Sequence, residues 1–297
     1  MILGSWFQAG DFRERGAHVE SVIVINPGSP IAILFASLIV AASGDTYAVE
    51  TNGSQKPSLA VVKLKASTKL SWMNAISSDD NDTLFQIIKE NDASSLLSLT
   101  ASNGKSALMV AAKTGDLDLI EALVEMGGNI NETTDTQGTP FMFAVLGDNL
   151  EVAQWLIEQG ADVDAVGSNG WTALTIAAAK GKTPMLQWLI GLEAKTQVRD
   201  VYRFTPFMRA VDNGYVETAA VLLSLVETDI NAKDEYDNTA LHHAVSAGNI
   251  AMINLLLEHH ADVRAVNRDG VSPLVIAQSL DKNSKAILSV LESESLP

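Results

Sequence analysis

The strongest constraint on the fold of this 297-residue chain is an internal repeat with a period of 33 residues. A short motif recurs from about residue 100 onward: Ser or Thr, then a small residue or Pro, then an apolar residue. Its six copies begin 33, 33, 33, 34 and 33 positions apart, at Ser106, Thr139, Thr172, Thr205, Thr239 and Ser272. A period of this length predicts a stack of similar units in which each unit contacts its neighbours.

Each copy carries residues typical of the beginning of a helix, and most copies also carry a residue typical of its end. Ser and Thr are good N-caps, because the side-chain oxygen accepts a hydrogen bond from an otherwise unpaired helix N–H, and Pro fits the first helical position. Five residues after each cap stands a small residue that lets a neighbouring helix approach closely: Ala111, Ala144, Ala177, Ala210, Ala244 and Ala277. In four copies a glycine nine residues after the cap is expected to end the helix: Gly115, Gly181, Gly214 and Gly248.

A second apolar run with helical periodicity follows the first helix in five copies, at 117–124, 150–157, 185–190, 216–223 and 250–257. Its expected N-caps are Asp116, Asn149, Thr183 and Asn249. Each unit is therefore predicted to be a pair of short helices joined to the next pair by a polar turn, so the fold class is all-α.

The repeat resembles that of the ankyrin-repeat family. Thr139–Ala144 (TPFMFA) and Thr239–Ala244 (TALHHA) are similar to the family's helix-opening motif, and Gly160–Val163 (GADV) and His260–Val263 (HADV) to its closing motif. The resemblance covers about residues 101–297. It implies an all-α ankyrin-repeat solenoid of about six helix-turn-helix repeats with β-turn or hairpin tips.

Residues 68–100 are expected to form a degenerate N-terminal capping repeat, because they carry two short apolar runs without the opening motif. Three turns depart from the family pattern. The third unit closes with Glu193–Val198, without the usual glycine and aspartate, and the turn glycine is replaced at Arg203 and at Asp237. We expect these turns to be less regular than the others.

Residues 1–48 are interpreted as an N-terminal segment with a signal peptide or an anchor. Ile31–Ala42 has the length of a signal-peptide apolar region and is shorter than the roughly 20 residues of a membrane span. Cleavage would follow Ser43 or Ala48, and residues 49–67, rich in Gly, Ser and Pro, would form a linker. The segment predicts export to the periplasm or the cell exterior. The alternatives are an uncleaved anchor and, if the segment is not a true leader, a cytoplasmic protein.

Charge excludes two classes of partner. The chain has 36 acidic and 20 basic residues, a net charge of −16. Residues 1–67 hold five of each sign, so the excess lies entirely in residues 68–297. This field repels phosphate backbones and anionic lipid surfaces. We therefore expect no nucleic-acid partner, and membrane contact only through an N-terminal anchor.

The sequence contains no recognisable catalytic motif: no glycine-rich phosphate loop, no HExxH and no nucleophile elbow. The chain has no cysteine, which excludes thiolate chemistry. The pairs His242–His243 and His259–His260 fall at different points of the repeat, so a shared metal ion is not expected. The family resemblance gives His242 a structural role, with hydrogen bonds within and between repeats. We expect no enzyme activity, no metal and no cofactor.

The family resemblance also places the binding face on the turn tips and on the concave side of the inner helices. Aromatic residues occupy three adjacent turns there, where small polar residues are usual, and Arg and His lie beneath them. Such residues are enriched in interface hot spots. The candidate partner-binding residues are Trp171, Tyr202, Phe204, Arg209, Tyr236, His243 and Phe143. The alternative is that Trp171 and Phe204 only pack on neighbouring turns and stabilise the stack.

These observations predict a non-enzymatic, monomeric protein-binding module or scaffold. Its acidic field favours a partner with a basic surface. Three alternatives remain open: an inhibitor or immunity-type protein that blocks an enzyme, an enzyme or ligand-binding protein that uses the repeat groove, and a cytoplasmic adaptor.

Overall fold

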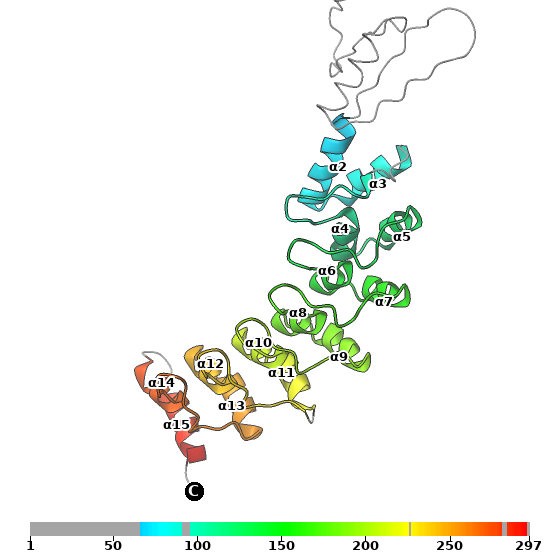
Figure 1. Ribbon diagram of the computed structural model, residues 1–297. Helices are drawn as coiled ribbons and strands as arrows, with labels where there is room; N and C mark the ends of the chain where they lie inside the picture. Colours follow the sequence, from blue (N-terminus) through cyan, green and yellow to red (C-terminus); the bar gives the residue numbers. More distant parts are fainter. Residues whose placement is uncertain (1–65, 91–95, 226, 281–283, 296–297) are drawn as a thin grey trace, which may run out of the picture. The chain divides into compact units, whose positions relative to one another are not determined.

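The computed structural model describes residues 66–90, 96–225, 227–280 and 284–295. These residues form fourteen helices, α2 to α15, and no strand (Figure 1). The expected all-α fold is therefore confirmed. The helices from Ser71 onward belong to one compact unit. The predicted signal segment and linker, which lie almost entirely within residues 1–65, fall outside the described residues.

Six short helices follow directly on the six predicted caps: α4 (Ala107–Thr114), α6 (Pro140–Gly147), α8 (Ala173–Ala179), α10 (Pro206–Asp212), α12 (Ala240–Ser246) and α14 (Pro273–Ser279). At five of the caps the Ser or Thr hydroxyl accepts a hydrogen bond from the backbone N–H three residues on. At Thr239 the cap is completed by His242, whose Nδ1 accepts from the Thr239 N–H at 3.1 Å. These six are the inner helices of the stack.

Each inner helix packs on the next one and on the outer helix of its own unit. The outer helices are α5 (Leu117–Glu125), α7 (Leu150–Glu158), α9 (Thr183–Gly191), α11 (Val216–Leu223), α13 (Ile250–Glu258) and α15 (Ser284–Ser295). The six periodic alanines of the inner helices are all fully buried. This confirms that they lie where neighbouring helices approach closely.

The N-terminal end of the stack is formed by α2 (Ala66–Ser78) and α3 (Asn81–Glu90), and α3 packs against α4. Trp72 and Leu84 are fully buried. Two helices thus occupy the region predicted as a degenerate capping repeat, although α2 already begins at Ala66. No helix in the described ranges is long and apolar enough to cross a membrane.

The turns that lack glycine are regular, contrary to expectation. Arg203 and Asp237 both have φ of 62°, close to the 80° of Gly170 at the same place in the repeat. In each of these turns the backbone N–H of the left-handed residue donates to the carbonyl three residues earlier, as from Arg203 to Asp200 at 2.8 Å. Glu193, with φ of 60°, likewise takes the place of a closing glycine. The hydrogen-bonded turn therefore sets the geometry, and a non-glycine residue tolerates the strain.

Successive turn tips are joined by backbone hydrogen bonds. The N–H of Val201 donates to the carbonyl of Asn169 at 3.0 Å, and the N–H of Glu235 donates to the carbonyl of Tyr202 at 3.0 Å. The same bond recurs between the other neighbouring turns. The tips are thus held in register, which fixes the positions of the side chains they carry.

One predicted outer-helix cap is wrong. Lys182 is the N-cap of α9, and Thr183 lies inside the helix. The Thr183 hydroxyl is instead buried 2.8 Å from the Thr218 hydroxyl of α11, so it links two outer helices. Asn149 does precede α7, but its side chain makes no capping bond and donates to the carbonyls of Ala112 and Lys113.

Candidate partner-binding site

Four of the seven candidate residues gather around a buried carboxylate, Asp200, at the start of the fourth turn. Its Oδ1 accepts from the backbone N–H groups of Tyr202 and Phe204, both at 2.9 Å. Its Oδ2 accepts from Trp171 Nε1 at 3.2 Å and from Arg209 Nε at 2.8 Å. The carboxylate is fully buried, and the arginine offsets the cost of removing its charge from water.

Arg209, on α10, is held by these aromatic rings as well as by Asp200. Its guanidinium carbon lies 5.4 Å from the ring centroid of Trp171, 5.8 Å from that of Tyr202 and 4.1 Å from that of Phe204. These distances are typical of cation–π contacts. The guanidinium is therefore paired within the chain, so Arg209 supports the aromatic rings and is not a free positive charge.

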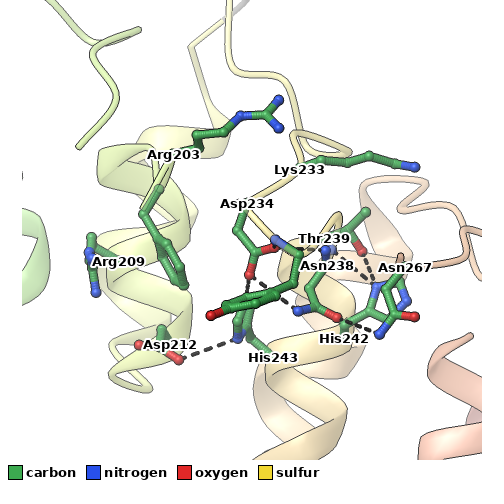
Figure 2. A network of polar contacts seen from close by, with 12 residues as sticks. Arg203, Arg209, Asp212, Lys233, Asp234, Asn238, Thr239, His242, His243 and Asn267 are labelled. Atoms are coloured by element: carbon green, nitrogen blue, oxygen red, sulfur yellow. Dashed lines mark hydrogen bonds and ion pairs between the residues drawn. The ribbon is translucent and has the colours of Figure 1, made fainter. Parts of the chain in front are cut away.

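The fifth repeat carries a second cluster of the same design around Asp234 (Figure 2). Its Oδ1 accepts from the backbone N–H groups of Tyr236 and Asn238, at 2.8 Å and 2.9 Å. Its Oδ2 lies 3.0 Å from His243 Nε2, and the other ring nitrogen of His243 faces Asp212 at 3.4 Å. The His243 ring also packs on Phe204, with centroids 4.9 Å apart. This tilted ring contact joins the two clusters.

Hydrogen bonding and burial set the protonation of this region. Burial alone would raise the pKa of Asp234, but hydrogen bonds from the backbone of Asn238 and Tyr236 and from the Asn238 and His243 side chains hold it below its ordinary 3.8. Asp234 is therefore a carboxylate at neutral pH. Burial lowers the pKa of His242 below 6.5. This agrees with a neutral ring that accepts at Nδ1 and donates from Nε2 to the Val271 carbonyl at 3.1 Å.

The expected role of His242 is confirmed, since it bonds within its own repeat and to the next one. In Figure 2 its ring lies between Thr239 and Asn267 and points away from Asp212, which contacts His243. Asn267 occupies the same turn position as Asp234 and donates to the Asn238 amide oxygen at 2.9 Å. His242 is thus a structural link and not part of the exposed surface.

The candidate residues differ in what they offer to solvent. The side chains of Tyr202 and Tyr236, on adjacent tips, are 52% and 58% exposed. Trp171 and Phe204 are partly buried, and Phe204 packs against the core. Phe143 also packs against the core, on α6, and α8 stands between α6 and α10. The structure therefore brings six of the residues into two linked clusters and leaves Phe143 apart.

The sequence reasoning missed the two organising carboxylates. Asp200 and Asp234 lie five residues before the caps Thr205 and Thr239. A signal was present, because the residue nine positions after each of them is a basic residue, Arg209 or His243. At the same two positions the third repeat has Gly167 and Ile176, and the sixth has Asn267 and Ile276. An acidic and a basic residue therefore occur together at these positions or not at all in these four repeats.

The described residues contain no cluster of three or more His, Asp or Glu side chains placed to hold a metal ion. The two carboxylates of the site are engaged within the chain by Arg209, by His243 and by N–H groups. The arrangement places two exposed tyrosines, Tyr202 and Tyr236, beside carboxylates that are paired within the chain.

Comparison with known proteins supports the fold on most of the repeat region. The profile of the family described as "Ankyrin repeats (3 copies)" matches residues 72–166 and 224–295, more than half of the chain. A second profile, "Ankyrin repeats (many copies)", matches residues 147–190. Ankyrin repeats generally mediate protein–protein interaction, and the family is typically non-enzymatic.

Individual relatives match over about a quarter of this chain. A putative ankyrin repeat protein of fowlpox virus (strain NVSL) is 40% identical over 67 residues, 23% of this chain and 10% of its own. A palmitoyltransferase of Danio rerio is 43% identical over 75 residues, which are 25% of this chain and 12% of the enzyme. A Notch-regulated ankyrin repeat-containing protein of Xenopus laevis is 39% identical over 74 residues, 24% of this chain and 65% of that protein.

The matches thus span less than two thirds of each relative, and the relatives share repeats with this chain and differ in what their names describe. The family profiles fall on the residues that form the paired helices. The chain belongs to the ankyrin-repeat family.

Proposed function

We propose that this chain is a non-enzymatic interaction module that binds a partner protein through the concave face and turn tips of repeats three to five. One observation carries the proposal: two adjacent tyrosines, Tyr202 and Tyr236, are more than half exposed while the backbone N–H group of each is fixed by a buried carboxylate. Exposed aromatic rings on a rigid support lose little conformational entropy when they bind. Such rings are typical anchors of protein interfaces.

Trp171, Phe204 and Arg209 have a supporting role in this proposal. Their contacts with Asp200 hold the tips in one conformation, so a partner meets a preformed surface. His243 extends the support into the next repeat through Phe204. Phe143 would contact only a partner long enough to reach the second repeat.

The net charge of −16 supports a partner with a basic surface, because long-range attraction steers oppositely charged proteins toward each other. We also propose that the protein acts as a monomer and that residues 1–48 direct its export. Fractionation of cells that produce the full chain or a chain without residues 1–48 tests export. Recovery of both in the cytoplasm would contradict it.

The binding face is tested by affinity capture with the full chain and with two variants. Tyr202→Ala/Tyr236→Ala removes the exposed anchors and leaves Asp200 and Asp234 in place. Tyr215→Ala is the matched control, because Tyr215 is another exposed tyrosine but lies between α10 and α11, away from the tips. A protein retained by the wild type and the control but lost by the double variant supports the proposal.

The captured protein is then purified and titrated against the same three chains at low and high salt. Affinity that falls with salt supports a basic partner surface. Equal affinity for all three chains would show that the tyrosines are not the binding anchors.

A further inference from the structure

A small pocket lies at the N-terminal end of the stack, well apart along the chain from the tyrosine tips. Its volume is about 220 Å³. It is lined by Leu97, Ser98, Ser106, Ala107, Leu108, Gly127, Gly128, Asn129 and Glu132. Pockets for drug-sized ligands measure roughly 300–1,000 Å³. This one is therefore suited to a single side chain or a very small molecule.

The unusual residue of the pocket is Glu132. It follows the first repeat at a position where later repeats have only small apolar residues: Ala165, Val198, Ala232 and Ala265. The later repeats thus pack without a carboxyl group at this position. Burying a carboxylate without a compensating charge is costly. Burial raises the pKa of Glu132 above 4.5, and the hydrogen bond from Ser106 offsets only part of this.

A hydrogen bond from Ser106 orients the carboxyl group of Glu132. The Ser106 hydroxyl donates to Glu132 Oε1, while the Ser106 oxygen accepts the capping bond from the Met109 N–H at 3.2 Å. Among the residues that the structure describes, no donor reaches the other oxygen, Oε2. One carboxylate oxygen is therefore fixed, and the second is available to a ligand.

Two further features give the pocket a negative polarity. Gly127 and Gly128 follow the C-terminal end of α5, where the helix dipole places partial negative charge. None of the described residues that line the pocket is a lysine, arginine or histidine that could neutralise Glu132. The apolar part of the wall comes from Leu97, Ala107 and Leu108, and Ser98 and Asn129 also line the pocket. A ligand that complements these walls has an apolar stem and a positively charged head.

We propose that this pocket binds a primary ammonium group on an alkyl stem, with the ammonium on Glu132 and the stem against Leu97 and Leu108. The ammonium is carried either by a lysine side chain of a protein partner or by a free alkylamine. Its charge compensates the partly buried carboxylate, and it donates hydrogen bonds to Oε2. The site does not depend on the tyrosine surface, and failure of either proposal leaves the other intact.

The test is a titration of the full chain, labelled with ¹³C at the leucine methyl groups, followed by nuclear magnetic resonance. The probes are n-butylammonium, its neutral counterpart n-butanol, and N-acetyl-lysine methylamide. We expect saturable shifts of the Leu97 and Leu108 methyl signals with butylammonium and none of comparable size with butanol. Shifts with the lysine derivative as well identify a protein-borne lysine as a possible occupant. Shifts with butylammonium alone identify a free amine.

Two variants show whether the carboxylate is responsible. Glu132→Gln keeps the shape and removes the charge, and it should weaken butylammonium binding by at least about tenfold, as expected for a lost charged hydrogen bond. Glu132→Ala places the residue found at this position in three other repeats, so it should fold and should also lose binding. Equal shifts with butanol, unchanged affinity in both variants, or no shift with either ammonium probe would overturn the proposal.

Discussion

Asp200 and Arg209 lie nine residues apart and form a buried ion pair, with Arg209 Nε 2.8 Å from Asp200 Oδ2. Asp234 and His243 occupy the same two positions one repeat later and are joined at 3.0 Å. The pair connects the start of a turn to the middle of the following inner helix. It therefore couples the conformation of the tip to the packing of the stack.

The first prediction concerns this coupling. Arg209→Ile alone leaves the Asp200 carboxylate buried without its cation, so we expect the free energy of unfolding to fall by about 3–5 kcal/mol. Asp200→Asn/Arg209→Ile recreates the pair of the sixth repeat, where Asn267 Oδ1 accepts the same two turn N–H groups. The double variant should lose less than half as much. Urea denaturation measures the difference.

The result is clearest as a double-mutant cycle with Asp200→Asn as the other single variant. A double variant that is destabilised by the sum of the two single effects would show that the two residues do not interact. Ankyrin arrays unfold by repeats, so the cycle is read from the whole denaturation curve and not from one assumed two-state fit.

The sequence predicted the features that depend on nearby residues and recur at the same position of each repeat. A Ser or Thr before an apolar run caps a helix by itself, so Thr205 and its equivalents were identifiable. The periodic alanines were identifiable because only a small side chain fits between closely packed helices. The same reasoning failed at Thr183, because its hydroxyl bonds to Thr218 in the next repeat and not to its own helix.

The sequence predicted where the candidate site lies in the repeat stack, but not how its side chains are oriented. The repeat register placed Tyr202, Phe204 and Arg209 near one another. It did not show that Phe204 turns inward while Tyr202 remains exposed, because that difference depends on contacts with Asp200 and on the neighbouring repeat. The conformation of Arg203 was missed for a related reason. A hydrogen bond to Asp200 fixes that turn more strongly than the residue's own preference.

The second prediction concerns the pH dependence of stability through Glu132. Burial raises its pKa in the folded state, so the folded protein holds this proton more tightly than the unfolded chain does. Its stabilising contribution is present below about pH 4.5 and is lost as pH rises through the folded value. Glu132→Ala should therefore be more stable than the wild type at pH 7, with a smaller difference at pH 4.

Thermal unfolding at both pH values, with no amine in the buffer, measures this effect. Glu158→Ala is a suitable control, because it removes an exposed glutamate at the end of α7, far along the chain from the pocket. A Glu132→Ala variant that is less stable than the wild type at pH 7 would show that the Ser106 bond outweighs the cost of burial.

The third prediction concerns His242, whose pKa is lowered mainly by burial. The unfolded chain binds this proton more tightly than the folded one, so stability is full above pH 6.5 and falls as pH drops through the folded value. The largest slope that one such group gives is about 1.4 kcal/mol per pH unit. His242→Met, which places the residue of Met208 at the equivalent position, should remove this component.

At pH 8 the His242→Met variant should be less stable by about 1 kcal/mol, because the bond to the Val271 carbonyl is lost. That deficit should shrink toward pH 5. Urea denaturation between pH 5 and 8 tests both statements. His259→Gln is the control, because it removes an exposed histidine that lies outside these contacts. A constant deficit at all pH values would refute the buried neutral state of His242.

The last prediction concerns backbone strain at the second turn tip. Gln137 has φ of 60° at a position where Gly170 has 80°. A non-glycine residue in this region is strained by about 1–2 kcal/mol, and part of the gain from glycine is offset by greater freedom in the unfolded chain. Gln137→Gly should therefore raise the free energy of unfolding by about 0.5–1 kcal/mol.

Gly170→Ala is the opposite control and should lower the free energy of unfolding. The added Cβ would lie 2.8 Å from the Asp200 Cα, and the residue would have a positive φ. Urea denaturation of the two variants beside the wild type decides the point. A Gln137→Gly chain no more stable than the wild type would mean that the glutamine makes favourable contacts that outweigh the strain.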